Sequence, residues 1–345
     1  MRIAVDVMGG DHGCGVVVRG ALMALQANPR ITELFLVGDE PQIRAAAGAL
    51  PDSRVRVIHA SEVLTMEDKP LLGLRRKKDC SVLRAVELLK DGRAEALISP
   101  GNTGGLVTAS TMRLRQLKGV ERAAIATVIP APENEFVLLD AGANVECRPL
   151  HLLQFAIMGS AYAHDILRIA KPRVGVLSVG TEDVKGNELT QETFKLCKQV
   201  DLHFIGNVEG HDLFLNRVDV VVCDGFVGNI VLKTCEGLAA GLFRWLRKEL
   251  GKSPKRAMGA LLAKGAFLAI KDRIDPEQHG GAPLLGLNGH VVIAHGSSRE
   301  HAIMNAVRQA AQVVRARFNE VLSRQLAAAA ERIHLNPPPP VLLPS

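Results

Sequence analysis

The stretch from Ala94 to Gly105, AEALISPGNTGG, decides how the rest of the chain is interpreted. Its apolar run Ala96-Leu97-Ile98 predicts a buried strand, and the small residues from Leu106 to Met112 predict a packed helix. A strand, a glycine-rich turn and a helix start can collect backbone N–H groups around an anion. The turn lacks the Gly-Lys-Ser/Thr of a Walker A loop. On this stretch alone, an anion site and a tight turn without a ligand are about equally good interpretations.

The composition favours an aliphatic α/β protein. Of 345 residues, 47% are hydrophobic and only 3% aromatic, which suits a parallel sheet between helices and argues against a base-stacking platform for nucleic acid. The net charge of +6 fits an acidic protein, anionic lipid or nucleic acid as partner, and does not choose between them. Six widely spaced cysteines without a CxxC pair indicate reduced thiols in a cytoplasm. We expect no signal peptide, and no apolar run of membrane-spanning length.

The start of the chain predicts a doubly wound sheet. The strands expected at Arg2–Val7, Leu34–Val37 and Val55–His59 alternate with helices at Val16–Ala27 and Ile43–Leu50. No GxGxxG follows the first strand, which weakens a dinucleotide-binding interpretation.

The end of the chain predicts a change from ordered to low-complexity sequence. We expect a long helix over His301–Arg324 and a single α/β domain over residues 1–325. The alanines and prolines of residues 326–345 predict a frayed helix end and a disordered tail.

Further predicted strands end in turns rich in glycine, asparagine and aspartate. These turns are Asp140–Asn144, Val179–Asn187, Gly206–Gly210 and Asp224–Asn229. Because ligands of open α/β sheets bind at the carboxyl ends of the strands, we expect the turns to converge on one cleft. Its expected polar lining is Asn102, Thr103, Asn144, Lys185 and Asn229. Any single turn fits the ordinary preference for glycine and asparagine, but the set favours a phosphate-type site.

The chemistry expected of this cleft needs no protein nucleophile. Amides, backbone N–H groups and one or two cations suit anion binding and the stabilisation of charge developing on oxygen. They fit a transfer in which the bound anion attacks. The sequence has no GxSxG, HExxH or metal-spaced Cys/His cluster. His12 and His295 lie in predicted turns, where a histidine acts as an acid or base less often than it is solvated or structural.

Two surface features suggest partners. The basic cluster Leu74–Lys78 is either a solvated face or a docking patch for an acidic partner. An amphipathic helix over Leu238–Leu250 and a second helical pattern over Lys255–Lys271 predict a helical hairpin. The hairpin could lie on an anionic membrane, pair with a twin chain or pack into the core.

Eight motifs over about residues 1 to 320 together resemble the PlsX family of bacterial phosphate acyltransferases. In chain order they are Asp6-x-Met8-Gly9-Gly10-Asp11, Ser99-x-Gly101-Asn102-Thr103-Gly104, Asp140-x-Gly142-Ala143-Asn144, Lys185-Gly186, Gly206-Asn207-Val208-Glu209-Gly210, Asp224-Gly225-Phe226-x-Gly228-Asn229, Gly280-Gly281-Ala282-Pro283-Leu284-Leu285-Gly286 and His295-Gly296. Eight ordered motifs are far more specific than any one of them.

The resemblance implies a doubly wound three-layer α/β/α sandwich with a mostly parallel sheet, similar to phosphotransacetylases and the isocitrate dehydrogenase type. A helical hairpin at about residues 233–272 extends from it. The implied reaction transfers a fatty acyl chain from acyl carrier protein to inorganic phosphate for phospholipid synthesis, without cofactor or metal. The resemblance also implies a homodimer in the cytoplasm, bound peripherally to the inner face of the cell membrane. The downstream membrane glycerol-3-phosphate acyltransferase is a candidate partner.

The resemblance also carries expectations for individual residues. Lys185 neutralises charge on the phosphate or the oxyanion, and Asn229 donates to the thioester oxygen. The expected phosphate-binding residues are Ser99, Gly101, Asn102, Thr103 and Gly104. The expected supporting residues of the cleft are Asp6, Asp11, Asn144, Asp224 and His295. The expected carrier-docking residues are Arg75, Arg76, Lys77 and Lys78. The expected membrane contacts are Trp245, Met258, Leu261, Leu262 and Leu268.

Some residues depart from the family pattern, and other functions stay open. The departures are Cys14, Cys80, Pro100, Gly105 and Ala123. Pro100 can change the turn, because proline fixes its own φ and removes a donor beside the anion site. The alternative enzyme is a phosphotransacetylase acting on a short acyl-CoA, and a dehydrogenase on the same fold is less favoured. A non-catalytic membrane scaffold is the alternative from another class.

Overall fold

The computed structural model describes residues 1–48, 52–274, 278 and 280–335. All of its named strands belong to one 11-stranded sheet, in the order β3-β2-β1-β4-β11-β10-β5-β6-β9-β7-β8. The strands are β1 (Arg2–Asp6), β2 (Glu33–Gly38), β3 (Val55–His59), β4 (Ala96–Ser99), β5 (Ala124–Pro130), β6 (Glu135–Leu139), β7 (Val174–Leu177), β8 (Phe204–Val208), β9 (Val220–Val222), β10 (Ala282–Leu285) and β11 (His290–Ile293).

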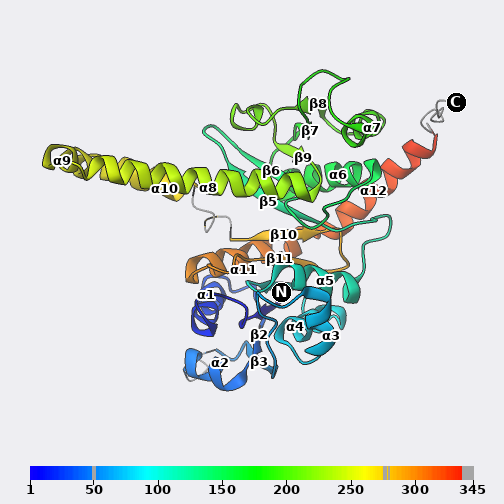
Figure 1. Cartoon of the computed structure of the whole chain (residues 1–345). Helices are drawn as coiled ribbons and strands as arrows, with labels where there is room; N and C mark the ends of the chain where they lie inside the picture. Colours follow the sequence, from blue (N-terminus) through cyan, green and yellow to red (C-terminus); the bar gives the residue numbers. More distant parts are fainter. Residues whose placement is uncertain (49–51, 275–277, 279, 336–345) are drawn as a thin grey trace.

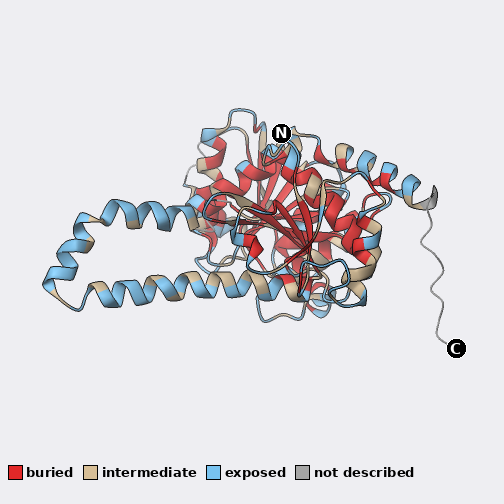
Figure 2. Cartoon of the chain, turned by 90° about the horizontal axis from the view of Figure 1, so that it is seen from above, coloured by how far each residue is buried: buried red, intermediate tan, exposed pale blue. Residues whose placement is uncertain are grey.

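Helices cover both faces of this sheet, as Figures 1 and 2 show. They are α1 (Cys14–Ala27), α2 (Glu40–Ala47), α3 (Pro70–Arg76), α4 (Ser81–Lys90), α5 (Thr103–Leu114), α6 (Pro149–Asp165), α7 (Glu188–Cys197), α8 (Gly225–Leu250), α9 (Pro254–Leu262), α10 (Lys264–Ile274), α11 (Glu300–Arg315) and α12 (Phe318–Leu335), with a short 3-10 helix η1 (Asp212–Phe214).

Alternation along β1 explains the layers. Ile3 and Val5 pack in a cluster with α1 and α11, whereas Ala4, between them, packs in a cluster with α4 and α5. Successive side chains of a strand point to opposite faces, so β1 is buried from both sides. The three-layer α/β/α arrangement expected from the sequence is confirmed.

Strand direction reverses in the middle of the sheet. The pairs β11–β10, β10–β5 and β5–β6 are antiparallel, and the other neighbouring pairs are parallel. The sheet is mostly parallel, as predicted. However, β1, β4 and β11 run opposite to β6, β7, β8 and β9. The glycine-rich turns therefore follow strands of two opposite directions and form two groups.

Several boundaries differ from the sequence prediction. The segment Ala282–Leu285, which lies within the glycine-rich motif Gly280–Gly286, is the antiparallel strand β10, and Gly206–Val208 of the predicted turn Gly206–Gly210 belongs to β8. The last long helix is divided at Ala316 and Arg317, where Arg317 has φ 51°. Its second part continues to Leu335, because Leu326 and Ala329 are buried against the core of the second half. Residues 336–345 lie outside the described residues.

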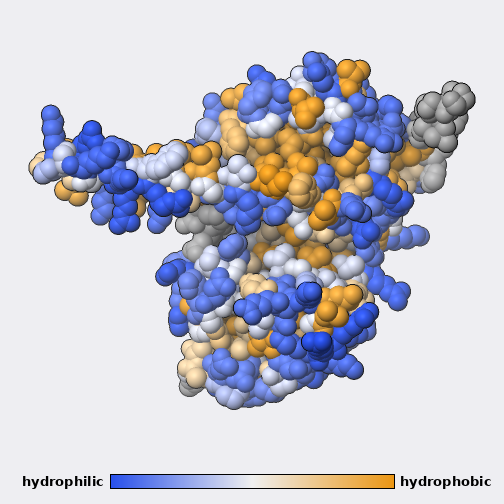
Figure 3. Space-filling view, viewed as in Figure 1, coloured by the Kyte–Doolittle hydropathy of each residue, from blue (hydrophilic) through white to orange (hydrophobic). Residues whose placement is uncertain are grey.

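The hairpin is a projecting arm, which we define as residues 238–274 (Figures 1 and 2). Helices α9 and α10 have no buried residues, and α8 buries only Gly225 and Gly228 among its described residues. By length and composition alone, α8 could cross a membrane, which corrects the expectation that no segment reaches that length. Figure 3 shows hydrophilic residues on the visible face of the arm, with apolar residues between them.

Candidate active site

The turn after β4 is built on a buried hydrogen-bond network with the end of β1. Ser99 is fully buried, and its Oγ donates to Asp6 Oδ2 at 2.7 Å and accepts from Gly101 N at 3.2 Å. Burial raises the pKa of Asp6. A Cβ on Gly9 would lie 2.2 Å from Gly101 Cα, so the two turns approach too closely for any other residue at position 9. Ser99 and Asp6 shape the turn from within the protein.

The side chain of Asn102 is used by the protein itself. Its Oδ1 accepts from Gly105 N at 2.8 Å, which makes Asn102 the N-cap of α5. Its Nδ2 donates to the carbonyl oxygens of Thr65 at 3.0 Å and Asp68 at 3.2 Å. The N–H groups of this amide are thus directed at protein acceptors, and its role in phosphate binding stays a prediction.

Thr103 and Gly104 carry the open donors of this turn. They are the first residues of α5, where backbone N–H groups have no helical acceptor. Within the described ranges, neither N–H has another acceptor. Thr103 is exposed, and Gly104 is half-buried beside Pro70 of α3. With the helix dipole, these N–H groups and the Thr103 hydroxyl can hold an anion.

The turn after β11 completes this first group. Asp11 N donates to Gly296 O at 2.8 Å, which places the turn after β1 beside the turn after β11. His295 is exposed, and its Nδ1 lies 2.8 Å from Ser297 Oγ. The structure thus places the predicted Asp6, Asp11 and His295 at the ends of β1 and β11, the two strands on either side of β4.

The second group of turns is formed at the ends of β6 and β9. Asn144 Nδ2 donates to Ala123 O at 2.7 Å and to Asp140 Oδ2 at 2.9 Å. Asp224 is the N-cap of α8 and accepts from Val227 N at 2.9 Å. Asn144 and Asp224 therefore hold the backbone of the site, and their polar groups serve the fold.

Asn229 and Lys185 are exposed polar groups of this second half. Asn229 lies in the first turns of α8, and a Cβ on Gly142 would be 3.6 Å from its Cβ. Lys185 lies in the turn between β7 and α7, which Asn207 Nδ2 holds through a 2.8 Å hydrogen bond to Glu182 O. In the part of the chain that the structure describes, neither the Asn229 amide nor Lys185 Nζ has a hydrogen-bond or ion-pair partner. Both are open to a ligand.

One apolar cluster connects the two groups of turns. It contains Leu106 of α5 and Ala141, and Leu232 of α8 packs against it. Residues three apart lie on the same side of a helix. Thr103 is therefore on the same side of α5 as Leu106, and Asn229 is on the same side of α8 as Leu232. The shared cluster thus links the first part of α5 to the turn after β6 and to α8.

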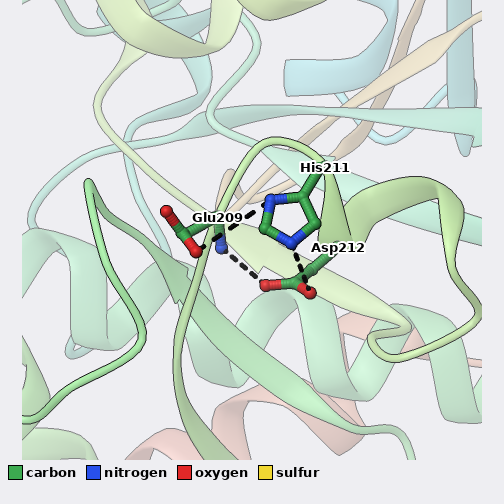
Figure 4. Close-up of side chains that lie close together, drawn as sticks. All are labelled: Glu209, His211 and Asp212. Carbon is green, nitrogen blue, oxygen red and sulfur yellow. Dashed lines mark hydrogen bonds and ion pairs between the residues drawn. The ribbon is translucent and has the colours of Figure 1, made fainter.

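A cluster of possible metal ligands lies after β8. His211 has its Nε2 3.5 Å from Asp212 Oδ1 and its Nδ1 4.0 Å from Glu209 Oε2 (Figure 4). Asp212 is buried, and its oxygens already accept from Arg217 Nη1 at 2.7 Å and Glu209 N at 3.0 Å. A guanidinium on the same oxygen disfavours a cation, so this cluster is explained by the turn it folds.

The predicted partner-binding residues are mostly exposed. Arg75, Arg76 and Lys78 lie on the surface at the end of α3, which packs against α5. Lys77 differs, because its Nζ lies 2.5 Å from Asp68 Oδ2 and 2.8 Å from Val63 O. Lys77 therefore has a structural role in this loop, and its role in docking stays a prediction. The five predicted membrane contacts are all exposed: Trp245, Met258, Leu261, Leu262 and Leu268.

Asp140 is a residue without a predicted role, and it lies at the centre of the 140–144 turn. The signal was present, since Asp140 is the first residue after β6 and precedes two small residues. A short polar residue there can bind the backbone N–H groups that follow it. One of its five donors, Ile125 N, belongs to β5, and this strand comes close to Asp140 only in the folded protein.

Three comparisons relate the chain to known proteins. A family model described as "Fatty acid synthesis protein" matches residues 1–321. A protein of Pelotomaculum thermopropionicum named phosphate acyltransferase is 47% identical over 321 residues, covering 93% of each chain. One of Desulforudis audaxviator with the same name is 49% identical over 317 residues, covering 91% of this chain and 93% of its own.

The fold is also found among solved structures. A phosphotransacetylase from Streptococcus pyogenes has a TM-score of 0.62 at 16% identity and covers 96% of this chain and 94% of its own. A branched-chain phosphotransacylase from Enterococcus faecalis has a TM-score of 0.54 at 16% identity, covering 91% of this chain and 99% of its own. At this identity the likeness concerns the fold alone.

Proposed function

The chain belongs to the fatty acid synthesis protein family, and because its relatives over nearly the whole length are named phosphate acyltransferases, we propose that it is a phosphate acyltransferase. The proposed reaction moves a fatty acyl group from the thioester of acyl carrier protein to inorganic phosphate. It yields acyl phosphate and holo-carrier, for phospholipid synthesis. The near-full-length relationship is the observation that carries this proposal.

The proposed mechanism divides the work between the two groups of turns. The N–H groups of Thr103 and Gly104 and the Thr103 hydroxyl hold phosphate, since they are open donors at a helix start. A phosphate oxygen attacks the thioester carbon, and the C–S bond breaks to release the carrier thiolate. Asn229 donates to the thioester oxygen as it gains charge, and Lys185 neutralises the negative charge. Holding both reactants supplies much of the rate.

The reaction is tested with long-chain acyl carrier protein, with and without inorganic phosphate. Free thiol is followed while acyl phosphate is trapped with hydroxylamine. Phosphate-dependent thiol release with trapped product supports the proposal. Release from a short acyl-CoA alone would instead favour a phosphotransacetylase, and no release from a folded sample would favour a membrane scaffold.

We propose that the acidic carrier protein docks on Arg75, Arg76 and Lys78. These side chains are exposed and belong to a segment that packs beside α5, where the proposed phosphate turn begins. The double variant Arg75→Glu/Arg76→Glu should raise the KM for acyl carrier protein without changing the thermal stability. Lys90→Glu, an exposed change at the end of α4, is the matched control.

We propose that the arm lies on the inner face of the cell membrane and that the protein is a cytoplasmic homodimer. Leu261 and Leu262 are 70% and 85% exposed, and basic residues flank them. Leu261→Asp/Leu262→Asp should reduce cosedimentation with vesicles containing phosphatidylglycerol. Sedimentation as a monomer would contradict the dimer. A membrane glycerol-3-phosphate acyltransferase is the partner we propose to receive the acyl phosphate.

A further inference from the structure

The carboxylate of Asp140 is buried and accepts from five N–H donors. Oδ1 accepts from Ile125 N at 2.9 Å. It also accepts from Gly142 N at 3.2 Å and Ala143 N at 3.0 Å. Oδ2 accepts from Asn144 N at 2.7 Å and from Asn144 Nδ2 at 2.9 Å. The carboxylate therefore folds residues 140–144 around itself and ties them to β5.

Every one of these five groups is a donor, which makes the site specific for a carboxylate. Burial raises the pKa of Asp140, and the hydrogen bonds from Ala143, Ile125 and Asn144 oppose that effect. An asparagine at this position would have nearly the same volume, but its NH2 group would face N–H groups. The substitution therefore removes acceptors from the turn without opening a cavity.

The turn that Asp140 organises is the surface on which α8 begins. Gly225 N donates to Asn144 O at 2.7 Å, and a Cβ on Gly225 would lie 2.8 Å from Asn144 N. A Cβ on Gly228 would lie 1.9 Å from Asp140 O. Glycine at both positions lets the first turn of α8 rest directly on this backbone. Asn229 is the next residue of the helix.

We propose that Asp140 is a positioning residue of the acyl-transfer site, which holds the 140–144 turn in the shape that aims the Asn229 amide. The placement of α8 follows from the contacts above. Only the role of Asn229 in the reaction rests on the proposed function.

The kinetic test is a double-mutant cycle between Asp140→Asn and Asn229→Ala. In the otherwise unchanged protein, Asp140→Asn should lower kcat at least tenfold and change the KM for phosphate less than twofold, since the phosphate turn belongs to the other half. In the Asn229→Ala background it should lower kcat less than threefold, because the group it positions is gone. A smaller loss of kcat in the otherwise unchanged protein, or a larger loss of kcat in the Asn229→Ala background, would overturn the proposal.

The control is Asp219→Asn, which changes another buried aspartate near the opposite end of β9. Asp219 accepts from Arg173 N at 2.8 Å and pairs with the Arg173 guanidinium. Its substitution should lower the thermal stability and leave kcat within twofold. A loss of kcat equal to that of Asp140→Asn would mean that general destabilisation explains both.

A second measurement does not depend on activity. Hydrogen exchange of residues 225–232 should be faster in Asp140→Asn than in the unchanged protein and in Asp219→Asn. Unchanged exchange would overturn the positioning role, even if the chain transfers no acyl group at all. If Asp140→Asn does not fold, Gly228→Ala takes its place, because its methyl group displaces α8 from Asp140 O while the carboxylate stays. It should cause the same loss of kcat.

Discussion

Lys77 and Asn102 hold the same loop through Asp68. Lys77 Nζ lies 2.5 Å from the Asp68 carboxylate, and Asn102 Nδ2 donates to the Asp68 carbonyl at 3.2 Å. The lysine keeps the pKa of Asp68 low, at about 2. Lys77, predicted to bind a carrier protein, and Asn102, predicted to bind phosphate, thus both stabilise the loop that contains Asp68.

Lys77→Ala should weaken this support. Asp68 loses its cation, the loop loosens, and the acceptors of Asn102 lose their fixed position. We expect a thermal midpoint a few degrees lower and a higher KM for phosphate, measured by calorimetry and steady-state kinetics. Lys78→Ala, which removes the neighbouring exposed lysine, should leave the thermal midpoint unchanged, and an equal effect from both would contradict the assignment.

Asn102 and Thr103 should separate structure from phosphate binding. Asn102→Ala removes the N-cap of α5, at a cost of about 0.5–2 kcal/mol in the free energy of unfolding. Thr103→Val removes only an exposed hydroxyl, so it should raise the KM for phosphate several-fold at unchanged stability. Denaturant unfolding and phosphate titration check the pair, and a Thr103→Val protein with normal phosphate kinetics would remove the hydroxyl from the site.

Lys185→Ala should lower kcat by well over tenfold without loss of stability, since its ammonium is exposed and without a partner in the described ranges. Lys185→Arg should recover part of the activity, because the charge returns in a different shape. Lys198→Ala is the matched control. Lys198 Nζ lies 2.8 Å from Asp183 Oδ2, so this substitution also removes one positive charge beside the turn that contains Lys185. Equal kcat values for Lys185→Ala and Lys198→Ala would argue against a specific role.

His290 should make stability depend on pH. Burial lowers the pKa of His290 to about 4, although the negative charge of Glu95 has the smaller effect of raising it. Between about pH 6.5 and 4 the unfolded chain binds a proton that the folded protein does not, so stability falls as the pH falls, by at most about 1.4 kcal/mol per pH unit. Chemical unfolding of His290→Gln should show a shallower fall, and parallel curves would contradict the assignment.

Much of the first half could be predicted from local sequence. The alternation of β1 and the strand-turn-helix of Ala94–Gly105 depend on neighbours in the chain, and the structure places strands and helices there. The strand β10 could not be predicted, because its glycine-rich flanks resemble a turn. Only its pairing with β11 and β5 makes it a strand, and those partners are distant in sequence.

The candidate site was predictable by residue and less so by role. Asn229 and Lys185 stand open, and whether they act on a thioester stays a prediction. Asn102 was assigned to phosphate because its side chain can donate, but the loop that claims those donors, residues 65–68, lies far from it in sequence. Likewise, no local pattern reveals that strand direction reverses between β11 and β6.

The length of α8 joins the candidate active site to the projecting arm. Its 26 residues form one uninterrupted helix of about 39 Å, with Asn229 near one end and Trp245 near the other. The helix acts as a rigid rod that is held where Gly225 and Gly228 contact the 140–144 turn. A contact that tilts the outer end of α8 would therefore also tilt the helix at Gly228, one residue before the Asn229 amide.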